Sequence, residues 1–339
     1  MKPRLEIHLS IAQQYRFLFG KPYQPGESEY LFNHSRCGIF LAIKSLDLPY
    51  GAWVGVMVYN CHTVMNAVKQ AGCRPLFLDV TDEMRLDMED LRLKVDKMSA
   101  IIVTHLFGIV SDVKKIREAY PNLVIIEDCA HAFGMKAFYG DFATFSIGQG
   151  KLPSIGDGGI LKVLNAKYAK AIDALYHDLP DYSGLQNARL LMKMIASSLL
   201  HSRIVYSWLT LPIKQKRGVP KDKEMLIPMR MSRGIRAVFL KERDVVSRMI
   251  ALRKSKAELL MSNLPKGVLK AMVGQNAFML VLYCNNPAVL QKYYRRQGVD
   301  TATHFKYAIH WAMEFGYSPK QCPNAEKLAN KLLMVPVYN

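Results

Sequence analysis

The sequence predicts an α/β protein: a large domain built on a mostly parallel sheet with helices on both faces, followed by a small C-terminal α/β domain. Short apolar runs alternate with amphipathic segments from residue 35 to residue 163, and the links between them are short. This alternation is typical of parallel strands joined by crossover helices. A chain of 339 residues with 50% hydrophobic and 22% charged residues is long and apolar enough for two such domains.

The elements of the first half follow from their periodicity. Ser35 is expected to cap a helix, because Ile39, Phe40, Ile43 and Leu46 recur at helical spacing. Further helices are expected at residues 63–71, 88–95 and 113–119. Apolar runs predict strands at residues 53–58, 75–80, 100–103, 123–126, 142–146 and 159–163.

The pattern changes at residue 185, where apolar residues take the spacing of helices with a wide apolar face. This stretch runs to Trp208 and is expected to end at Pro212. The basic run after it predicts an exposed linker, formed by Lys214, Lys216, Arg217, Lys221 and Lys223.

These patterns predict two domains. We expect a large domain over residues 1–225, with residues 186–224 as an apolar and basic helical insertion and linker. A small domain is expected over residues 226–339. Its helices are expected at residues 235–260, 287–296 and 325–333, and its clearest strand at residues 278–283.

The charge balance favours anionic partners. The net charge is +18 and the pI is about 9.6, which suits nucleotides, phosphorylated sugars or an anionic membrane face. Nucleic acid is not expected, because no nucleic-acid-binding motif accompanies the charge. The six cysteines are scattered without a C-x-x-C pair, so we expect reduced thiols, a cytoplasmic location and no metal site. A secretory signal or a bilayer-spanning apolar run is not expected.

Lys151 gives the strongest chemical signal. It follows the predicted strand at residues 142–146, and glycines stand on both sides of it. A lysine amine can form an imine with a carbonyl group, and burial would lower its pKa as that reaction requires. Most lysines are solvated surface residues, so the residues around Lys151 decide between a surface lysine and a reactive one. Ser146 and the nearby glycines would let hydroxyl and backbone groups approach a phosphate, although the turn at residues 156–159 is equally consistent with an ordinary hairpin.

Asp128 follows another predicted strand, at the sheet edge where ligands of such folds bind. An ionised carboxylate there would keep a pyridine nitrogen protonated, and His131 would lie close enough to bond a ring oxygen. Taken alone, these two residues are more often a segment cap and a buried loop histidine. The helix that begins at residues 35–37 offers free N–H groups to a phosphate. Together these features indicate an enzyme that uses pyridoxal phosphate (PLP).

Several motifs in order strengthen this interpretation. From about Ser35 to the C-terminus, the chain resembles the DegT/StrS family of sugar aminotransferases, which are PLP enzymes of the aspartate-aminotransferase fold type I. The similar segments are residues 58–68, residues 74–80, His105-Leu106-Phe107-Gly108, Glu127-Asp128-Cys129-Ala130-His131, the Ser146-to-Lys151 spacing with Gly158-Gly159, residues 304–310 and residues 322–338.

The resemblance implies a role for each matched residue. Lys151 would bind PLP covalently, Asp128 would pair with the pyridine nitrogen, and His131 would contact the ring oxygen. The PLP phosphate would be held by Ser146 and by the backbone around Arg36 and Cys37.

Two departures from the family pattern concern the ring and the substrate. Cys61 stands where the family's ring-stacking aromatic is expected, so stacking would fall to Tyr59 or His62 or be weak. The family's Gly-x-Asn-x-Arg motif appears as residues 226–230, which keep Arg230 and lack the asparagine. Because this segment reaches the neighbouring subunit in the family, the resemblance implies a homodimer. Substrate contacts are implied for Tyr59, His62, Arg230, His304 and His310.

The expected function is amino transfer from an amino acid, with glutamate as the donor, to a nucleotide-linked keto-sugar. Such a reaction serves the synthesis of surface polysaccharide, such as lipopolysaccharide, or of amino sugars. Dehydration is not expected, because the family's dehydratases carry histidine in place of Lys151. The alternative is a catalytically altered family member that acts as a scaffold or membrane-surface protein, with residues 186–224 as a peripheral contact at the inner face of the membrane.

Overall fold

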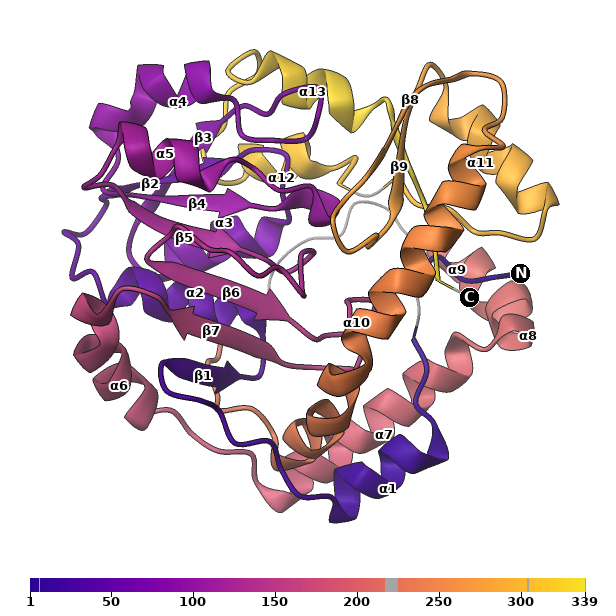
Figure 1. Ribbon diagram of the computed structural model, residues 1–339, viewed down its shortest axis with the longest axis horizontal. Helices are drawn as coiled ribbons and strands as arrows, with labels where there is room; N and C mark the ends of the chain where they lie inside the picture. The colour runs from indigo at the N-terminus through magenta and orange to yellow at the C-terminus, as the bar shows by residue number, and fades with distance from the viewer. Residues whose placement is uncertain (6, 217–224, 304, 339) are drawn as a thin grey trace.

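The computed structural model describes residues 1–5, 7–216, 225–303 and 305–338 of the chain. Its centre is a seven-stranded sheet (Figure 1). In spatial order the strands are β1 (Glu29–Phe32), β7 (Gly159–Val163), β6 (Phe142–Ser146), β5 (Val124–Asp128), β4 (Ala100–Thr104), β2 (Trp53–Met57) and β3 (Arg74–Leu78). The strands from β6 to β3 run parallel, whereas β7 is antiparallel to both β6 and β1.

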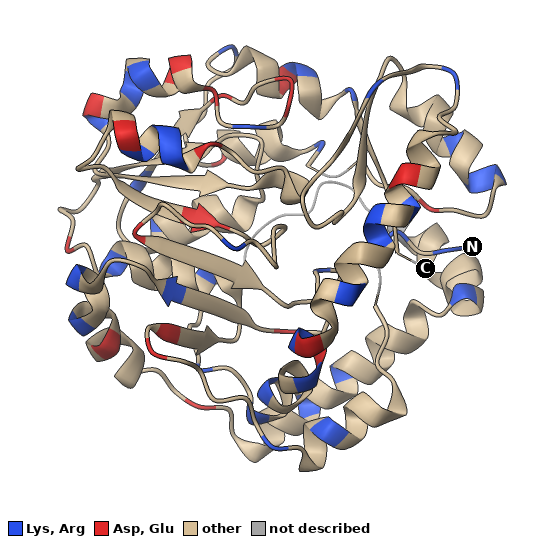
Figure 2. Cartoon of the chain, in the orientation of Figure 1, with Lys and Arg blue, Asp and Glu red and all other residues tan. Residues whose placement is uncertain are grey.

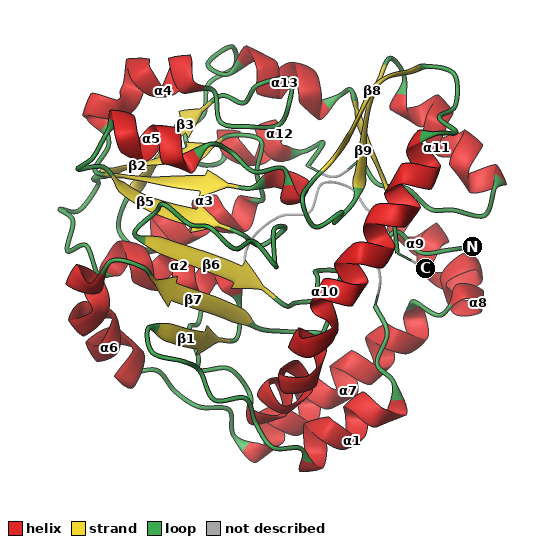
Figure 3. Cartoon of the chain, in the orientation of Figure 1, coloured by secondary structure: helices red, strands yellow, loops and turns green. Residues whose placement is uncertain are grey.

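The central strands are apolar because both faces of the sheet are covered. Every residue of β4 and of β6 is buried, which explains their continuous apolar runs. Helices α2 (Ser35–Lys44) and α3 (His62–Gln70) cover one face, and α5 (Val113–Ala119) and α10 (Arg233–Met261) lie over the other (Figure 3). The predicted α/β fold with a mostly parallel sheet is thereby confirmed.

A second, three-stranded sheet lies beside the first. Its order is β10 (Leu332–Val335), β9 (Leu280–Cys284) and β8 (Val268–Val273), and both pairs are antiparallel. The helices not yet named are α1 (Ile11–Phe19), α4 (Met88–Lys94), α6 (Ala169–His177), α7 (Gly184–Leu200), α8 (Arg203–Val205), α9 (Leu211–Lys216), α11 (Pro287–Arg296), α12 (Ala308–Met313) and α13 (Pro323–Ala329), with a π-helix, η4 (Tyr206–Thr210). The predicted boundary between a large domain (1–225) and a small domain (226–339) stays a prediction.

Three local predictions were wrong. Ser35 is the first residue of α2, and His34 occupies the N-cap without a side-chain hydrogen bond. Pro212 does not end the helical stretch, because it is the second residue of α9. Proline is tolerated in the first turn of a helix, where the backbone N–H has no acceptor within that helix. The helix expected at residues 325–333 ends at Ala329, and the chain then enters β10.

The segment predicted as a basic linker falls largely on residues 217–224, which lie outside the described residues. Before it, the apolar residues from 185 onward form α7, α8 and η4, as their spacing predicts. In the described part of the chain, no helix combines the length and the apolar content that crossing a bilayer requires.

Candidate active site

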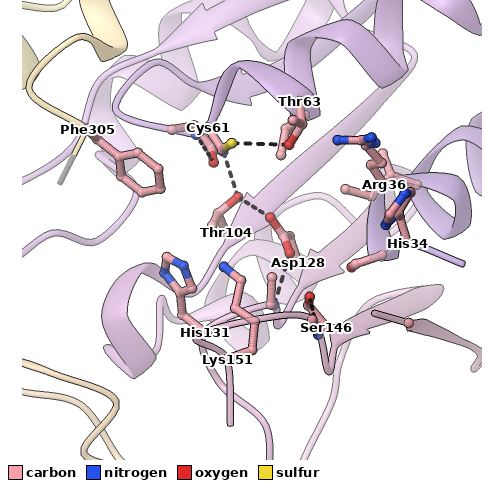
Figure 4. A pocket seen from close by; sticks show the side chains of 17 residues that line it. His34, Arg36, Cys61, Thr63, Thr104, Asp128, His131, Ser146, Lys151 and Phe305 are labelled. Atoms are coloured by element: carbon pink, nitrogen blue, oxygen red, sulfur yellow. Dashed lines mark hydrogen bonds between the residues drawn. The ribbon is translucent and has the colours of Figure 1, made fainter. Parts of the chain in front are cut away.

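A cavity opens at the carboxyl ends of three neighbouring strands (Figure 4). Thr104, Asp128 and Ser146 are the last residues of β4, β5 and β6, and all three line it. This is the edge at which doubly wound sheets bind ligands. The space that the cavity encloses, counted out into the solvent at its open mouth, is about 760 Å³. Further lining residues are His34, Ser35, Arg36, Asn60, Cys61, Thr63, Ala130, His131, Gly148, Lys151, Gly158 and Phe305.

Lys151 reaches this cavity from the loop between β6 and β7. Its backbone N–H donates to the carbonyl of Gly148 at 3.1 Å, so the loop turns sharply enough to direct the side chain inward. Burial lowers the pKa of the Lys151 ammonium, while the charges of Cys61 and Asp128 act against that shift. The amine is therefore biased toward the neutral form that attacks a carbonyl group.

Asp128 faces the same cavity and is 3% exposed. Its carboxylate accepts hydrogen bonds from the Ala130 N–H at 3.0 Å and from the Thr104 hydroxyl at 3.2 Å. Thr104 in turn accepts from the Asn60 amide at 2.8 Å, so a buried chain of hydrogen bonds orients the carboxylate. Burial nevertheless raises the pKa of Asp128 above its usual range, in spite of the Ala130 bond and the positive charge of Lys151. A cation bound in the cavity would stabilise this carboxylate.

His131 is held by stacked rings. Its ring stacks on Phe278 at a centroid distance of 4.5 Å, on Phe107 at 5.5 Å and on Phe305 at 5.9 Å. Its Nδ1 accepts a hydrogen bond from the Phe107 N–H at 3.3 Å, so a neutral ring carries its proton on Nε2. His131 lines the cavity with this ring.

The other end of the cavity is built from backbone and hydroxyl groups. Ser35 and Arg36 open α2 there, and Gly158 lies against them. The Ser35 Oγ is buried and has no hydrogen-bond partner among the described residues, so it is a donor that lacks an acceptor. A phosphate at the helix N-terminus would supply that acceptor. Ser146 also lines this region, and its Oγ accepts from the Gly148 N–H at 3.4 Å.

The Gly158-Gly159 pair is required by the close approach of two chain segments. A Cβ on Gly159 would lie 2.2 Å from the backbone nitrogen of Ser35, and Gly158 has a φ of 120°. The glycines thus allow β7 to press against the start of α2, which fixes the helix N-terminus beside the cavity. The pair also lies at the end of the connection between the antiparallel strands β6 and β7, and the approach of this turn to a phosphate stays a prediction.

Cys61 lines the cavity at the N-cap of α3, where it accepts a hydrogen bond from the Thr63 hydroxyl at 3.1 Å. Burial alone would raise the pKa of the Cys61 thiol, but interactions with His62 and Thr63 outweigh burial and lower it. The two aromatic residues considered for ring stacking lie elsewhere. Tyr59 is fully buried with its ring edge-to-face against Phe305, and His62 packs against Trp311.

Several predicted site residues lie outside the cavity. Cys37 is fully buried and donates its thiol to the Asn33 side chain at 3.0 Å. Arg230 forms a two-pronged ion pair with Asp181, at 2.9 and 2.8 Å. His310 is exposed on α12, and His304 lies outside the described residues.

The lining residues that the sequence did not single out include Asn60, Thr104 and Phe305. Thr104 carried a usable signal, because it ends a strand and directly precedes the His105-Leu106-Phe107-Gly108 motif. Asn60 and Phe305 lie within the similar segments 58–68 and 304–310, but nothing in those segments marks them individually.

His105, Glu127 and Cys129 form a buried cluster that has metal-binding side chains. Hydrogen bonds account for its histidine and its glutamate. His105 Nε2 bonds Glu127 at 3.0 Å, and the other Glu127 oxygen accepts from the N–H groups of Tyr139 and Gly140, each at 2.7 Å. These bonds tie the end of β5 to the segment that precedes β6.

Two solved structures with this fold carry the name sugar aminotransferase. CalS13 from Micromonospora echinospora aligns with a TM-score of 0.74 and 16% identity, covering 100% of this chain and 95% of that one. Spr1654 from Streptococcus pneumoniae, solved in a PLP-form, aligns with a TM-score of 0.75 and 14% identity over 99% and 93% of the two chains. At such identities the likeness establishes the fold.

Curated relatives match over shorter stretches. A GDP-perosamine synthase from Escherichia coli O157:H7 is 34% identical over 133 residues, which are 36% of each chain. A dTDP-4-dehydro-2,3,6-trideoxy-D-glucose 4-aminotransferase from Saccharopolyspora spinosa is 28% identical over 174 residues, 48% of this chain and 45% of that one. The matched stretches thus span about a third to a half of these relatives.

The match to a sequence family is far longer. The sequence model of the DegT/DnrJ/EryC1/StrS aminotransferases matches residues 33–339, which confirms the resemblance inferred from the ordered motifs. This chain belongs to the DegT/DnrJ/EryC1/StrS aminotransferase family.

Proposed function

We propose that this chain is a PLP-dependent aminotransferase that moves an amino group from an amino acid, with glutamate as the donor, to a nucleotide-linked keto-sugar. One observation carries the proposal. The Lys151 amine and the Asp128 carboxylate line a single cavity, and the N-terminus of α2 with its unpaired Ser35 hydroxyl lines the same cavity. These are the groups needed at the aldehyde, the ring nitrogen and the phosphate of PLP.

PLP is the cofactor of this family, as expected from the sequence. When bound, it withdraws electrons from the carbon that bears the migrating amino group. The chain's own groups suit it. Asp128 is a buried carboxylate with a raised pKa that a pyridinium cation would stabilise. The Ser35 hydroxyl at the positive N-terminal end of α2 would bind the phosphate.

The residues around the cavity would divide the remaining work. Lys151, with its pKa lowered by burial, would take a proton from the substrate carbon and return it elsewhere. His131 would donate its Nε2 proton to the ring oxygen. Phe278 and Phe305 pack around the imidazole of His131 and would exclude water from that side.

The substrate class is inferred from chemistry and from the names of the relatives. Those relatives are named for GDP-linked and dTDP-linked sugars. The net charge of +18 would attract such an anionic acceptor. We therefore place the reaction in the synthesis of surface polysaccharide, such as lipopolysaccharide, or of other amino sugars.

The remaining expectations stay predictions. They are a homodimer, a cytoplasmic location, and peripheral contact with the inner face of a membrane through residues 186–224. The physical basis of the membrane contact is the surface formed by α1, α7 and η4. The alternative of a scaffold without turnover is disfavoured, because a family member freed from catalysis has no need to keep both a lysine and a buried carboxylate on one cavity.

The test is an amino-transfer assay with the purified PLP-loaded protein. Glutamate is supplied with a panel of keto-sugars linked to GDP, dTDP or UDP, and both 2-oxoglutarate and the amino-sugar are measured. We expect one member of the panel to be aminated by the wild type and not by Lys151→Ala. Absence of transfer to every member, from a protein that retains PLP, would contradict the proposal.

A further inference from the structure

Helix α7 lies beside α1 at one edge of the molecule and is followed by α8 and η4 (Figure 1). The Thr210 hydroxyl of η4 donates to the Leu200 carbonyl of α7 at 2.6 Å. The backbone N–H of Leu9, just before α1, donates to the Ser198 hydroxyl of α7 at 2.9 Å. Inward-facing residues of α1 and α7 belong to one buried cluster, which includes Phe17 and Met194. Helices α1, α7 and η4 therefore form a layer that is packed on its inner side.

The outer sides of these elements are also apolar. On α7, Leu185, Met192 and Leu199 recur every seven residues, and each is more than 60% exposed. Ile204 of α8 and Trp208 of η4 lie one turn apart, and their exposed fractions are 76% and 82%. On α1, the side chains of Ile11, Tyr15, Leu18 and Phe19 all face solvent. A surface helix is normally polar on its outer face, so an exposed apolar stripe on each of three adjoining elements indicates a partner.

The charged residues of these elements are basic. Residues 183–213 contain three lysines and arginines and no acidic residue, whereas the frequency in the whole chain, 28 in 339, would place about three acidic residues there. Residues 7–21 also contain no acidic residue, and the carboxylate beside α1 is that of Glu242 on α10, 3.8 Å from the Arg16 guanidinium. Arg189 and Lys193 are exposed one turn apart on α7, next to its apolar stripe. Figure 2 shows blue and no red on α1, α7 and α8.

We propose that this edge, the α1–α7–η4 face, binds the surface of an anionic phospholipid bilayer. Exposed apolar side chains can enter the boundary between head groups and acyl chains, while the flanking cations meet lipid phosphates. Trp208 suits this boundary, because indole rings concentrate at membrane interfaces. A protein partner would also cover apolar side chains, but it would not account for the lack of acidic residues in residues 7–21 and 183–213. The proposal is independent of the proposed amino transfer, because none of these side chains lines the cavity.

The test is co-sedimentation of the full-length protein with vesicles at low salt. Vesicles of phosphatidylcholine alone are compared with vesicles that also contain phosphatidylglycerol. We expect binding to the anionic vesicles only, weakened by added salt, together with a blue shift in fluorescence that Trp208→Phe removes. The double variant Ile204→Ser/Trp208→Ser should lose binding. Arg189→Glu and Lys193→Glu should each weaken it at least fivefold, the factor that corresponds to the ~1 kcal/mol contributed by one cation near such a surface.

Matched controls lie on other surfaces. Tyr50 and Leu93 are exposed apolar residues, and Lys115 is an exposed cation, so Tyr50→Ser, Leu93→Ser and Lys115→Glu should bind vesicles as the wild type does. Amino transfer in solution should be unchanged in every variant, which separates this test from that of the proposed function. The proposal is overturned if the wild type ignores anionic vesicles, or if the controls lose binding equally. A third result also overturns the proposal: Ile204→Ser/Trp208→Ser changes the sedimentation coefficient of the protein and leaves its vesicle binding unchanged. In that case the face would join two copies of the chain.

Discussion

Asp128→Asn should separate the two consequences of burying a carboxylate. The side chain is 3% exposed, and asparagine has nearly the same shape and keeps an oxygen for the Ala130 N–H. What the variant loses is the negative charge that would pair with a protonated pyridine nitrogen. Removing one partner of a buried ion pair costs ~3–5 kcal/mol, which corresponds to roughly a 100- to 4,000-fold loss. We expect a loss of that order in kcat/KM, together with weaker PLP binding in equilibrium dialysis.

The same substitution should have the opposite effect on the cofactor-free protein. Burial raises the pKa of Asp128 in the folded state, so the folded protein holds this proton more tightly than the unfolded chain does. The stability linked to this proton is present below the unfolded pKa of about 3.9 and is lost as the pH rises through the folded pKa. Asparagine does not ionise, so Asp128→Asn removes this loss of stability at higher pH. Urea unfolding from pH 4 to pH 8 should therefore show a smaller fall in stability for the variant than for the wild type.

Asp79 provides the matched control. It is also a buried aspartate whose pKa is raised by burial, but its carboxylate accepts from the backbone N–H groups of Ala325 and Asn324, away from the cavity. Asp79→Asn should change the stability of the protein without changing its affinity for PLP. The reasoning is refuted if Asp128→Asn binds PLP as tightly as the wild type, or if the pH dependence of its cofactor-free stability is unaltered.

Two further predictions concern the walls of the cavity. Gly159→Ala would place a Cβ against the Ser35 backbone. We expect a loss of about 1–3 kcal/mol in the free energy of unfolding by urea, together with weaker PLP binding. The control Gly184→Ala has open space around its Cβ and should lower the free energy of unfolding by less than ~0.5 kcal/mol. In the cofactor-free protein, iodoacetamide should alkylate Cys61 faster than any other cysteine. His62 and Thr63 lower the pKa of the Cys61 thiol against the effect of burial, and the other five cysteines are buried. Bound PLP should slow this alkylation, as measured by peptide mass spectrometry, and equal labelling with and without PLP would contradict the position of Cys61 on the cavity wall.

The sequence predicts the parts of the site that depend on strand ends. Asp128 and Ser146 each end an apolar run, and in a parallel sheet such residues meet at one edge, so their shared cavity followed from the pattern alone. The same rule applied to Thr104 would have found it as well. Residues on loops and on later helices could not be placed in this way, because tertiary contacts decide their direction.

Arg230 and Phe305 illustrate that limit. The predicted substrate contact of Arg230 stays a prediction, whereas its two-pronged ion pair with Asp181, 49 residues earlier, could not be foreseen. Phe305 reaches the cavity from the far end of the sequence and packs on His131. Neither contact has a local signature, since each joins segments that only the folded chain brings together.

The most direct test of the account is reduction of the PLP-loaded protein with borohydride, followed by peptide mass spectrometry. The account predicts that a visible absorbance band disappears on reduction and that the reduced cofactor is attached to the peptide containing Lys151. Lys151→Ala should show neither the band nor the label. A label on a different lysine, or a protein that binds PLP without a reducible link, would contradict the central claim.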